Sequence, residues 1–279
     1  MIKTSRQLKD LVRNRSKGNN AMAQVIIRRY IMERFLERVS MSDYNRKLIF
    51  KGGLMISSMV GLDNRSTMDI DTTVTGETLS IPEIESIIRE IISIQVEDNI
   101  SFEIKNISEI MDEAEYPGLR VSLEALLDNM RTPLKIDIST GDVITPHEIV
   151  YEYPLMFEKR TIPIFAYNVE TILAEKLQSI LARGSANTRL RDYYDLCILS
   201  DTVDINYNDL RAAFFATCKN RGTLSLIPNK DLVLSQIHSD SGMKALWESY
   251  QRKYSYAKDY AWIDVMKKLE LMFNRIVSD

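Results

Sequence analysis

Three aspartates in strand-like surroundings are the residues of this chain whose types and spacing best suit chemistry. Asp69 and Asp71 lie one residue apart in the segment 68–74, whose alternating apolar and polar residues and β-branched side chains predict a half-buried strand. Both side chains therefore emerge on one face, with Cα atoms roughly 6–7 Å apart. Asp137 is flanked by isoleucines in a second strand-like stretch and supplies a third carboxylate if the two strands pair. Hard oxygen donors of this kind suit Mg²⁺, whose remaining ligands are water and substrate phosphates.

A pair of glycines upstream of the aspartates adds a second element of such a site. Gly52 and Gly53 follow the apolar segment 48–51 and precede a short helix predicted over 54–60. Glycines at the start of a helix let backbone N–H groups approach a phosphate closely. No Gly-x-x-x-x-Gly-Lys-Ser/Thr sequence occurs, which disfavours a P-loop NTPase. Each motif alone is common by chance, so it is their order and spacing that favour an enzyme that handles phosphate with Mg²⁺.

The elements that must position these residues are a small sheet followed by a helical region. Strands are predicted over 100–107, 119–127 and 134–139, with turns at 116–118 and 128–129, so these strands form an antiparallel meander. Helices are predicted over 21–39, 80–92, 169–183, 189–200, 208–219, 229–236, 241–254 and 257–277. With 279 residues the chain is expected to form two domains. We predict an α+β protein with a sheet-containing domain over 1–160 and a helical domain over 161–279.

The charge of the chain is unevenly distributed. Residues 1–60 carry a net charge of +9, residues 61–160 of −13 and residues 161–279 of +1. A basic end attracts polyanions, whereas an acidic middle suits carboxylates around a cation. The basic end either contacts nucleic acid or forms the solvated faces of two helices, and the sequence leaves both readings open. The residues concerned are Arg13, Arg15, Lys17, Arg28, Arg29, Arg34 and Arg38.

Other classes of protein are disfavoured by what the sequence lacks. The cysteines, Cys197 and Cys218, and the histidines, His147 and His238, have no metal-ligand spacing, so no zinc site is predicted. No window of 18 apolar residues occurs, and the first six residues are too polar for a signal peptide. We therefore expect a cytoplasmic protein without a membrane partner.

Two cations lie on the helix predicted over 169–183. Lys176 falls within the apolar stripe of this helix, and Arg183, seven residues later, lies on almost the same face. The pair could contact the triphosphate of a nucleotide and offset charge in the transition state. The alternative is a lysine stem that packs on the core while its amine reaches solvent.

With these motifs the sequence resembles the polymerase-β type of nucleotidyltransferase, in which Gly-Gly/Ser, a helix, Asp-x-Asp and a later aspartate follow one another. More specifically it is similar to the AbiEii family of abortive-infection toxins, to which the MenT toxins are related. The matching blocks span residues 51–196 and occur in the order of the family. They are Lys51-Gly52-Gly53, Arg65 to Asp71, Lys135-Ile136-Asp137, Ala174 to Leu177 with Arg183, and Arg191 to Leu196.

The resemblance implies a polymerase-β-like fold and Mg²⁺-dependent transfer of an NMP from an NTP to an acceptor hydroxyl. Asp69 and Asp71 would hold the metal with Asp137, which would also help to deprotonate the acceptor. Asp192 would belong to the active site, with Asp195 a weaker candidate. Nucleotide-binding roles would fall to Gly52, Gly53, Arg65, Thr67, Lys176 and Arg183. The helical domain, through Lys176 and Asp192, would close the active-site cleft.

For the biology, the resemblance implies a toxin of a toxin–antitoxin system that acts in abortive phage infection and inhibits growth or translation. The favoured acceptor is RNA, in particular the 3′ end of tRNA, and the expected partner is a winged-helix antitoxin encoded alongside. One alternative is a nucleotidyltransferase that modifies a small molecule or a protein. The other is a non-catalytic RNA-binding protein whose carboxylates are structural.

Overall fold

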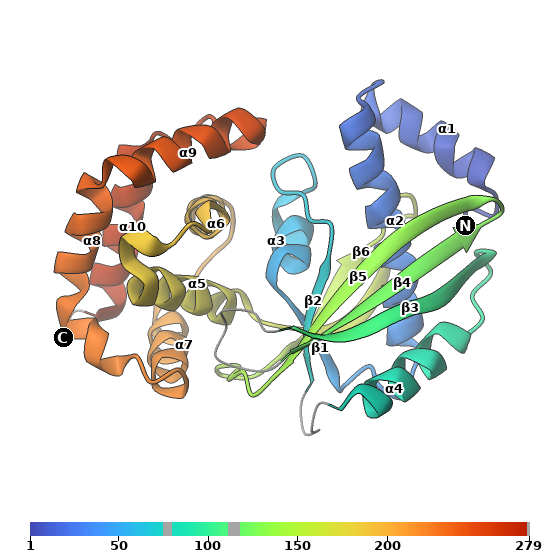
Figure 1. Cartoon of the computed structure of the whole chain (residues 1–279), viewed down its shortest axis with the longest axis horizontal. Helices are drawn as coiled ribbons and strands as arrows, with labels where there is room; N and C mark the ends of the chain where they lie inside the picture. Colours follow the sequence, from blue (N-terminus) through green and yellow to red (C-terminus); the bar gives the residue numbers. More distant parts are fainter. Residues whose placement is uncertain (75–79, 111–117, 278–279) are drawn as a thin grey trace. The chain divides into compact units, whose positions relative to one another are not determined.

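The protein is an α+β molecule with one mixed sheet and a group of helices (Figure 1). The computed structural model describes residues 1–74, 80–110 and 118–277. The predicted turn at 116–118 therefore lies partly outside the described residues. The chain divides into two compact units. The sheet unit comprises Met1–Ser58, Ser66–Gly141 and Ile149–Ala166, and the helical unit comprises Met59–Arg65, Asp142–Glu148 and Tyr167–Asp279.

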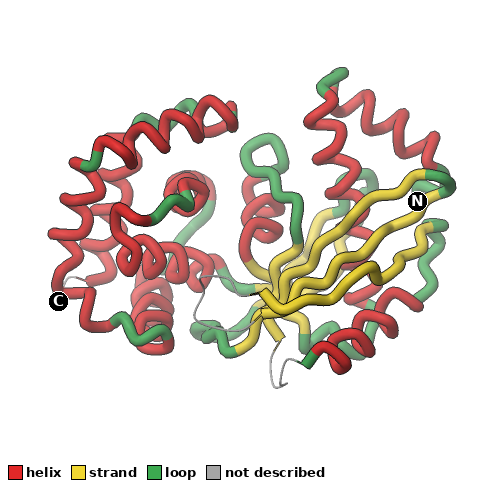
Figure 2. The backbone as a smooth tube through the Cα atoms, viewed as in Figure 1, coloured by secondary structure: helices red, strands yellow, loops and turns green. Residues whose placement is uncertain are grey.

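Within the described part of the chain, seven strands form the sheet in the order β3-β4-β5-β2-β1-β7-β6 (Figure 2). They are β1 (Leu48–Lys51), β2 (Ile70–Val74), β3 (Ile100–Ile110), β4 (Gly118–Leu127), β5 (Met130–Thr140), β6 (Ile149–Pro154) and β7 (Thr161–Ala166). The predicted meander is confirmed, because β3, β4 and β5 pair antiparallel in sequence order. The pairs β2–β5 and β1–β7 are parallel, so the sheet is mixed.

The helices of the sheet unit are α1 (Ser5–Ser16), α2 (Asn20–Ser40), α3 (Gly52–Val60) and α4 (Ile81–Ser93). In β5 the side chains of Leu134, Ile136 and Ile138 are buried, whereas their neighbours along the strand are exposed or half-buried. Alternation of this kind means that one face of the strand is apolar and packed and the other is polar. Because α2 contacts β5 and α4 contacts β3, these two helices cover the apolar face.

The helical unit contains α5 (Val169–Arg183), α6 (Leu190–Thr202), α7 (Tyr207–Asn220), α8 (Lys230–Ser239), α9 (Ser241–Lys253) and α10 (Trp262–Val277). The last predicted helix, 257–277, begins too early, since α10 starts at Trp262. Trp247 and Gln251 both donate side-chain hydrogen bonds, at 2.9 Å, to the carbonyl of Tyr260 and hold the preceding residues in a turn. No described helix combines the length and the apolar character needed to cross a membrane.

Strands β6 and β7 were not predicted from the sequence. Each has six residues, they lie at one end of the sheet, and each carries a proline, Pro154 and Pro163. Prolines disfavour a strand, and β6 at the sheet edge exposes three of its six residues, although β7 buries Ile162, Ile164 and Ala166 on one face. The predicted strand over 68–74 also starts late, because β2 begins at Ile70 and Asp69 lies in the bend before it.

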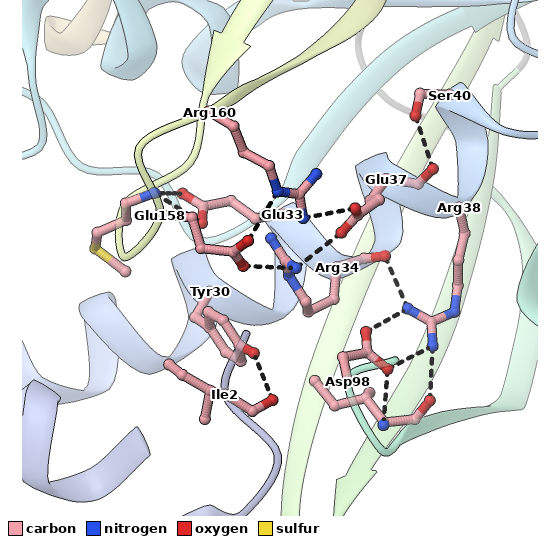
Figure 3. Close-up of polar contacts among 12 residues, drawn as sticks. Ile2, Tyr30, Glu33, Arg34, Glu37, Arg38, Ser40, Asp98, Glu158 and Arg160 are labelled. Atoms are coloured by element: carbon pink, nitrogen blue, oxygen red, sulfur yellow. Dashed lines mark hydrogen bonds and ion pairs between the residues drawn. The ribbon is translucent and has the colours of Figure 1, made fainter. Parts of the chain in front are cut away.

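Three of the four arginines of α2, namely Arg29, Arg34 and Arg38, are buried in ion pairs, and Figure 3 shows those of Arg34 and Arg38. Arg34 pairs with Glu37 at 2.8 Å and with Glu158 at 3.2 Å, and Arg29 pairs with Glu33 at 3.3 Å. A second arginine, Arg160, bridges Glu37 and Glu158 from the other side. The expectation that Arg29 and Arg34 lie on a solvated or nucleic-acid-binding face is therefore wrong. Carboxylates of the sheet unit neutralise their positive charge.

Arg38 shows the same arrangement at the C-terminal end of α2. Its guanidinium donates to both carboxylate oxygens of Asp98, at 2.8 and 2.9 Å, and to the carbonyl of Ile100 at 2.8 Å. The side chains of Arg38 and Asp98 are 3% and 0% exposed, so for Arg38 too the solvated reading is wrong. The pair fastens α2 to the start of β3.

We predict that Arg38→Met lowers the free energy of unfolding by about 3–5 kcal/mol, because Asp98 would be left as an unpaired buried charge. Arg89→Met is the matched control: Arg89 forms an ion pair with Glu85 but is 64% exposed, so its loss should cost less than about 1 kcal/mol. Urea unfolding of both variants measures the difference. Equal small losses would show that the Arg38–Asp98 pair contributes nothing special.

Candidate active site

A row of four charged residues crosses the polar face of the sheet, one from each of four neighbouring strands. Asp71 of β2 pairs in register with Asp137 of β5 on one side and with Lys51 of β1 on the other. Arg120 of β4 is the register partner of Asp137. Direct register partners point to the same face of a sheet, so the order across the row is Lys51, Asp71, Asp137, Arg120. The prediction that the strand of Asp137 pairs beside that of Asp71 is confirmed.

The Gly52–Gly53 turn orients the carboxylate of Asp71. The backbone N–H of Gly53 donates to Oδ2 of Asp71 at 3.3 Å. Gly52 has a φ of +63°, and a Cβ atom there would lie 2.5 Å from the same oxygen. Glycine is thus required at position 52 both by its backbone conformation and by the close approach of the carboxylate. The phosphate contact expected of these glycines stays a prediction, and their structural role is to orient Asp71.

The carboxylate of Asp71 is electrostatically crowded. The pKa of Asp71 is raised to about 6, chiefly by burial and also by the neighbouring Asp137 and Asp69, against the lowering effects of Lys51 and the Gly53 N–H. Negative charge therefore accumulates at this point with incomplete compensation by the protein. A bound cation would relieve it.

Asp137 is held by Arg120. The guanidinium donates to both oxygens of Asp137, from Nε and Nη2, each at 2.7 Å. Arg120 was not among the residues selected from the sequence, although a signal existed. A two-residue turn at 128–129 pairs residues whose numbers add to 257, which places Arg120 opposite Asp137. One carboxylate of the predicted metal set is thus engaged by a guanidinium in this structure.

The metal-ligand set of Asp69, Asp71 and Asp137 stays a prediction. Over residues 1–74, 80–110 and 118–277, no three His, Cys, Asp or Glu side chains converge so as to hold a metal ion. Asp69 lies in the bend before β2, where the hydroxyl of Thr67 donates to its carbonyl at 3.2 Å. Mg²⁺ is commonly held by one or two carboxylates plus substrate phosphates and water, and Asp69 with Asp71 meets that requirement.

A second polar cluster lies within the helical unit. Lys176 of α5 contacts Asp192 at 2.6 Å and Asp195 at 2.8 Å, both on α6. Arg65 donates to Asp195 from Nε at 2.7 Å and from Nη2 at 3.3 Å. The sequence thus selected residues that the structure brings together, since these four side chains form one network.

Burial and charge act against each other in this cluster. Burial disfavours the charged form of Lys176, but the attraction of Asp192 and Asp195 outweighs it, so the pKa of Lys176 lies above its ordinary value. The pKa of Asp195 is lowered because Lys176 and Arg65 outweigh the effect of its burial. Lys176 is therefore a fixed positive charge at physiological pH.

Three residues of the predicted set have surroundings that the sequence did not anticipate. Arg65 is 4% exposed and committed to Asp195, so it positions that carboxylate, and its phosphate contact stays a prediction. Arg191, at the start of α6, donates to the hydroxyl of Tyr254 at 2.9 Å. Arg183 is half-buried at the C-terminal end of α5.

Comparison with known proteins gives the family. The profile described as nucleotidyl transferase AbiEii toxin, type IV toxin–antitoxin system, matches residues 34–269, most of the chain. The chain belongs to the AbiEii family of nucleotidyltransferase toxins. Family membership makes it a nucleotidyltransferase that uses an NTP and a divalent metal ion and that has an antitoxin as its counterpart. The resemblance found in the sequence is confirmed.

Solved structures confirm the fold. MenT4, a nucleotidyltransferase toxin from Mycobacterium tuberculosis H37Rv, is similar with a TM-score of 0.58 at 14% identity, over 97% of this chain and 99% of that one. JHP933 from Helicobacter pylori is similar with a TM-score of 0.51 at 16% identity, over 91% and 93% of the two chains. No curated protein matches the sequence. The α+β, polymerase-β-like fold is thus shown for this member of the AbiEii family.

We predict that Gly52→Ala costs more stability than Gly61→Ala, although both glycines flank α3 and both have a positive φ. Position 61 has no atom within 4 Å of an added Cβ, so only the backbone cost of about 1–2 kcal/mol applies there. At position 52 the clash with Asp71 adds about 1–3 kcal/mol and displaces the carboxylate. Urea unfolding of the two variants checks this, and equal losses would show that Asp71 yields without cost.

Proposed function

We propose that this AbiEii protein transfers an NMP from an NTP to the 3′ hydroxyl of an RNA, with tRNA as the favoured acceptor and Mg²⁺ as the metal. The observation that carries the proposal is the charged row on the sheet, in which the crowded carboxylate of Asp71 is oriented by Gly53 and flanked by Asp137. A row of this kind suits binding of a cation and a triphosphate at one place.

In the sheet unit, Asp69 and Asp71 would hold the Mg²⁺. When bound, the ion would neutralise the charge of the triphosphate and of the pyrophosphate that leaves. The Gly52–Gly53 turn fixes the direction of Asp71, and its remaining N–H groups are available to a phosphate. Asp137 would accept the proton of the acceptor hydroxyl, for which one of its two hydrogen bonds from Arg120 must open.

In the helical unit, Lys176 would bind the triphosphate as a permanent cation, with Arg183 on the same helix as a second contact. Asp192 and Asp195 aim the ammonium group of Lys176, and Arg65 in turn fixes Asp195. Thr67 supports the bend that carries Asp69. Lys176 and Asp192 thus have roles in nucleotide binding, and Asp195 and Arg65 position them.

The consequence for the cell would be arrest of growth or translation, since an RNA with an altered 3′ end fails in its function. A winged-helix antitoxin encoded alongside would counter the toxin. Family membership favours an enzyme over the non-catalytic alternative. A small molecule or a protein as acceptor is the alternative that an acceptor assay decides.

We predict that the purified protein, incubated with Mg²⁺, total cellular RNA and each α-labelled NTP in turn, labels RNA. Asp69→Ala should abolish the labelling, because it removes a metal ligand. Asp63→Ala is the matched control: this exposed aspartate lies six residues before Asp69, outside the charged row, and its loss should leave the rate unchanged. The label identifies the preferred nucleotide and the size of the acceptor together.

Each other outcome has a definite meaning. Labelling that persists in Asp69→Ala would contradict the role of the carboxylate pair. Nucleotide bound in calorimetry without any label in RNA would contradict the RNA acceptor and favour a small molecule or a protein. Equal loss in Asp63→Ala and Asp69→Ala would show that the effect is not specific to the charged row.

A further inference from the structure

The ion pairs of α2 leave most of the exposed positive charge of the basic end on α1. Arg29, Arg34 and Arg38 are buried, whereas all five cations between Arg6 and Lys17 are exposed. Four of these five, here called the α1 stripe, are Arg6, Lys9 and Arg13 on α1 and Lys17 at its C-cap. Nothing in the candidate active site uses them.

The α1 stripe has a regular geometry. Arg6, Lys9 and Arg13 follow one another at intervals of three and four residues, so at about 100° per residue they occupy one face of the helix, and Lys17 follows directly after its last turn. From Arg6 to Lys17 the row is about 16 Å long at 1.5 Å per residue. Among residues 1–74, 80–110 and 118–277, no carboxylate forms an ion pair with any of the four. Asp10 is the one acidic residue on α1.

The opposite face of α1 is fixed to the sheet unit. Leu8 and Val12 are 0% and 3% exposed, and a capping box formed by Thr4 and Gln7 starts the helix. The backbone N–H of Ser5 also donates to Asp128, in the turn between β4 and β5, at 2.7 Å. The apolar face is therefore already buried, so α1 cannot insert it into a membrane as an interfacial helix does.

We propose that the α1 stripe binds the phosphate backbone of a base-paired segment of the RNA acceptor. The inference rests on the proposed function, which supplies an RNA substrate. A row of cations along one helix matches the regularly spaced phosphates of a duplex. Contacts of this kind fix position without reading sequence.

The distance from the α1 stripe to the carboxylates indicates how long the paired segment of the RNA acceptor must be. Ser5 is tied to Asp128, and Asp128 lies nine residues from Asp137 across the same hairpin. At about 3.4 Å per residue the Ser5 end of α1 is about 30 Å from Asp137. An acceptor that reaches both places needs a paired segment that extends about 30 Å from its reacting 3′ end. Short single strands would reach Asp137 without touching the stripe.

The test compares two variants that each lose four positive charges. The first is Arg6→Gln, Lys9→Gln, Arg13→Gln and Lys17→Gln together. The matched control replaces four exposed lysines of the helical unit by glutamine, at Lys219, Lys244, Lys258 and Lys267. Binding of a 20-base-pair RNA duplex with an unpaired 3′ end is measured against NaCl concentration for both variants and for the unaltered chain.

We predict that the α1 variant reduces the slope of log K against log[salt] by about 3 to 4, because each lost phosphate contact removes about 0.9 from it. The control should reduce the slope by less than about 1. An equal reduction in both variants, or none in either, would overturn the proposal. Binding to vesicles of phosphatidylserine and phosphatidylcholine that depends on the α1 stripe, with RNA binding unchanged, would assign the stripe to a lipid surface instead.

A second measurement separates this inference from the proposed function. NMP transfer to a trinucleotide should be equal in the α1 variant and the unaltered chain, whereas KM for the duplex acceptor should rise at least tenfold in the variant. Absence of transfer to any RNA would contradict the proposed function while the salt slopes still decide the role of the stripe. Equal KM values for the duplex in both proteins would overturn the role of α1 in acceptor binding.

Discussion

The parallel pairing of β2 with β5 is the constraint on which the site depends, because it forces the carboxylates of Asp71 and Asp137 side by side. Two adjacent carboxylates repel each other. A cation on each side of the pair compensates their negative charge. The pairing of β1 with β2 places Lys51 beside Asp71, and the hairpin of β4 and β5 places Arg120 beside Asp137. The Gly-Gly turn then brings a backbone N–H to the more buried carboxylate. The order of strands is thus also the order of charges, and in the proposed function a cation with its phosphates would bind at this row.

Compensation of buried charge is also the rule elsewhere in the molecule. In α2, buried arginines are matched by Glu33, Glu37 and Asp98, which lock that helix to the sheet. In the helical unit Asp195 accepts from both Arg65 and Lys176. Buried ion pairs of this kind fix geometry more than they add stability, since removal of one partner leaves the other uncompensated. The cations that remain exposed are therefore the ones available to a partner.

Local patterns in the sequence predicted the parts of the fold that have strong periodicity. The alternation around Asp71 and Asp137 gave two strands, and the two-residue turn at 128–129 gave the meander. The candidate residues came from motif order and from the family resemblance, and the network of Lys176 with Asp192 and Asp195 agrees with that selection. The sequence did not predict β6 and β7, because both strands are short and each contains a proline.

The sequence also could not distinguish buried from solvated arginines. Arg34 and Arg13 look alike in a helical pattern, yet one is buried between Glu37 and Glu158 and the other is exposed. Glu37 is a local partner, three residues from Arg34, but Glu158 lies 124 residues away along the chain, and no local rule contains that second contact. The position of Arg120, by contrast, follows from a local rule, because the two-residue turn at 128–129 sets the register that places it opposite Asp137.

The most direct test of the account is a crystal structure of the protein with Mn²⁺ and a non-hydrolysable NTP, in which anomalous scattering locates the metal. The account predicts an ion that is coordinated by Asp69 and Asp71 and by oxygens of the triphosphate, at about 2.0–2.3 Å. An ion bound elsewhere on the chain, or a nucleotide bound away from these carboxylates, would contradict it.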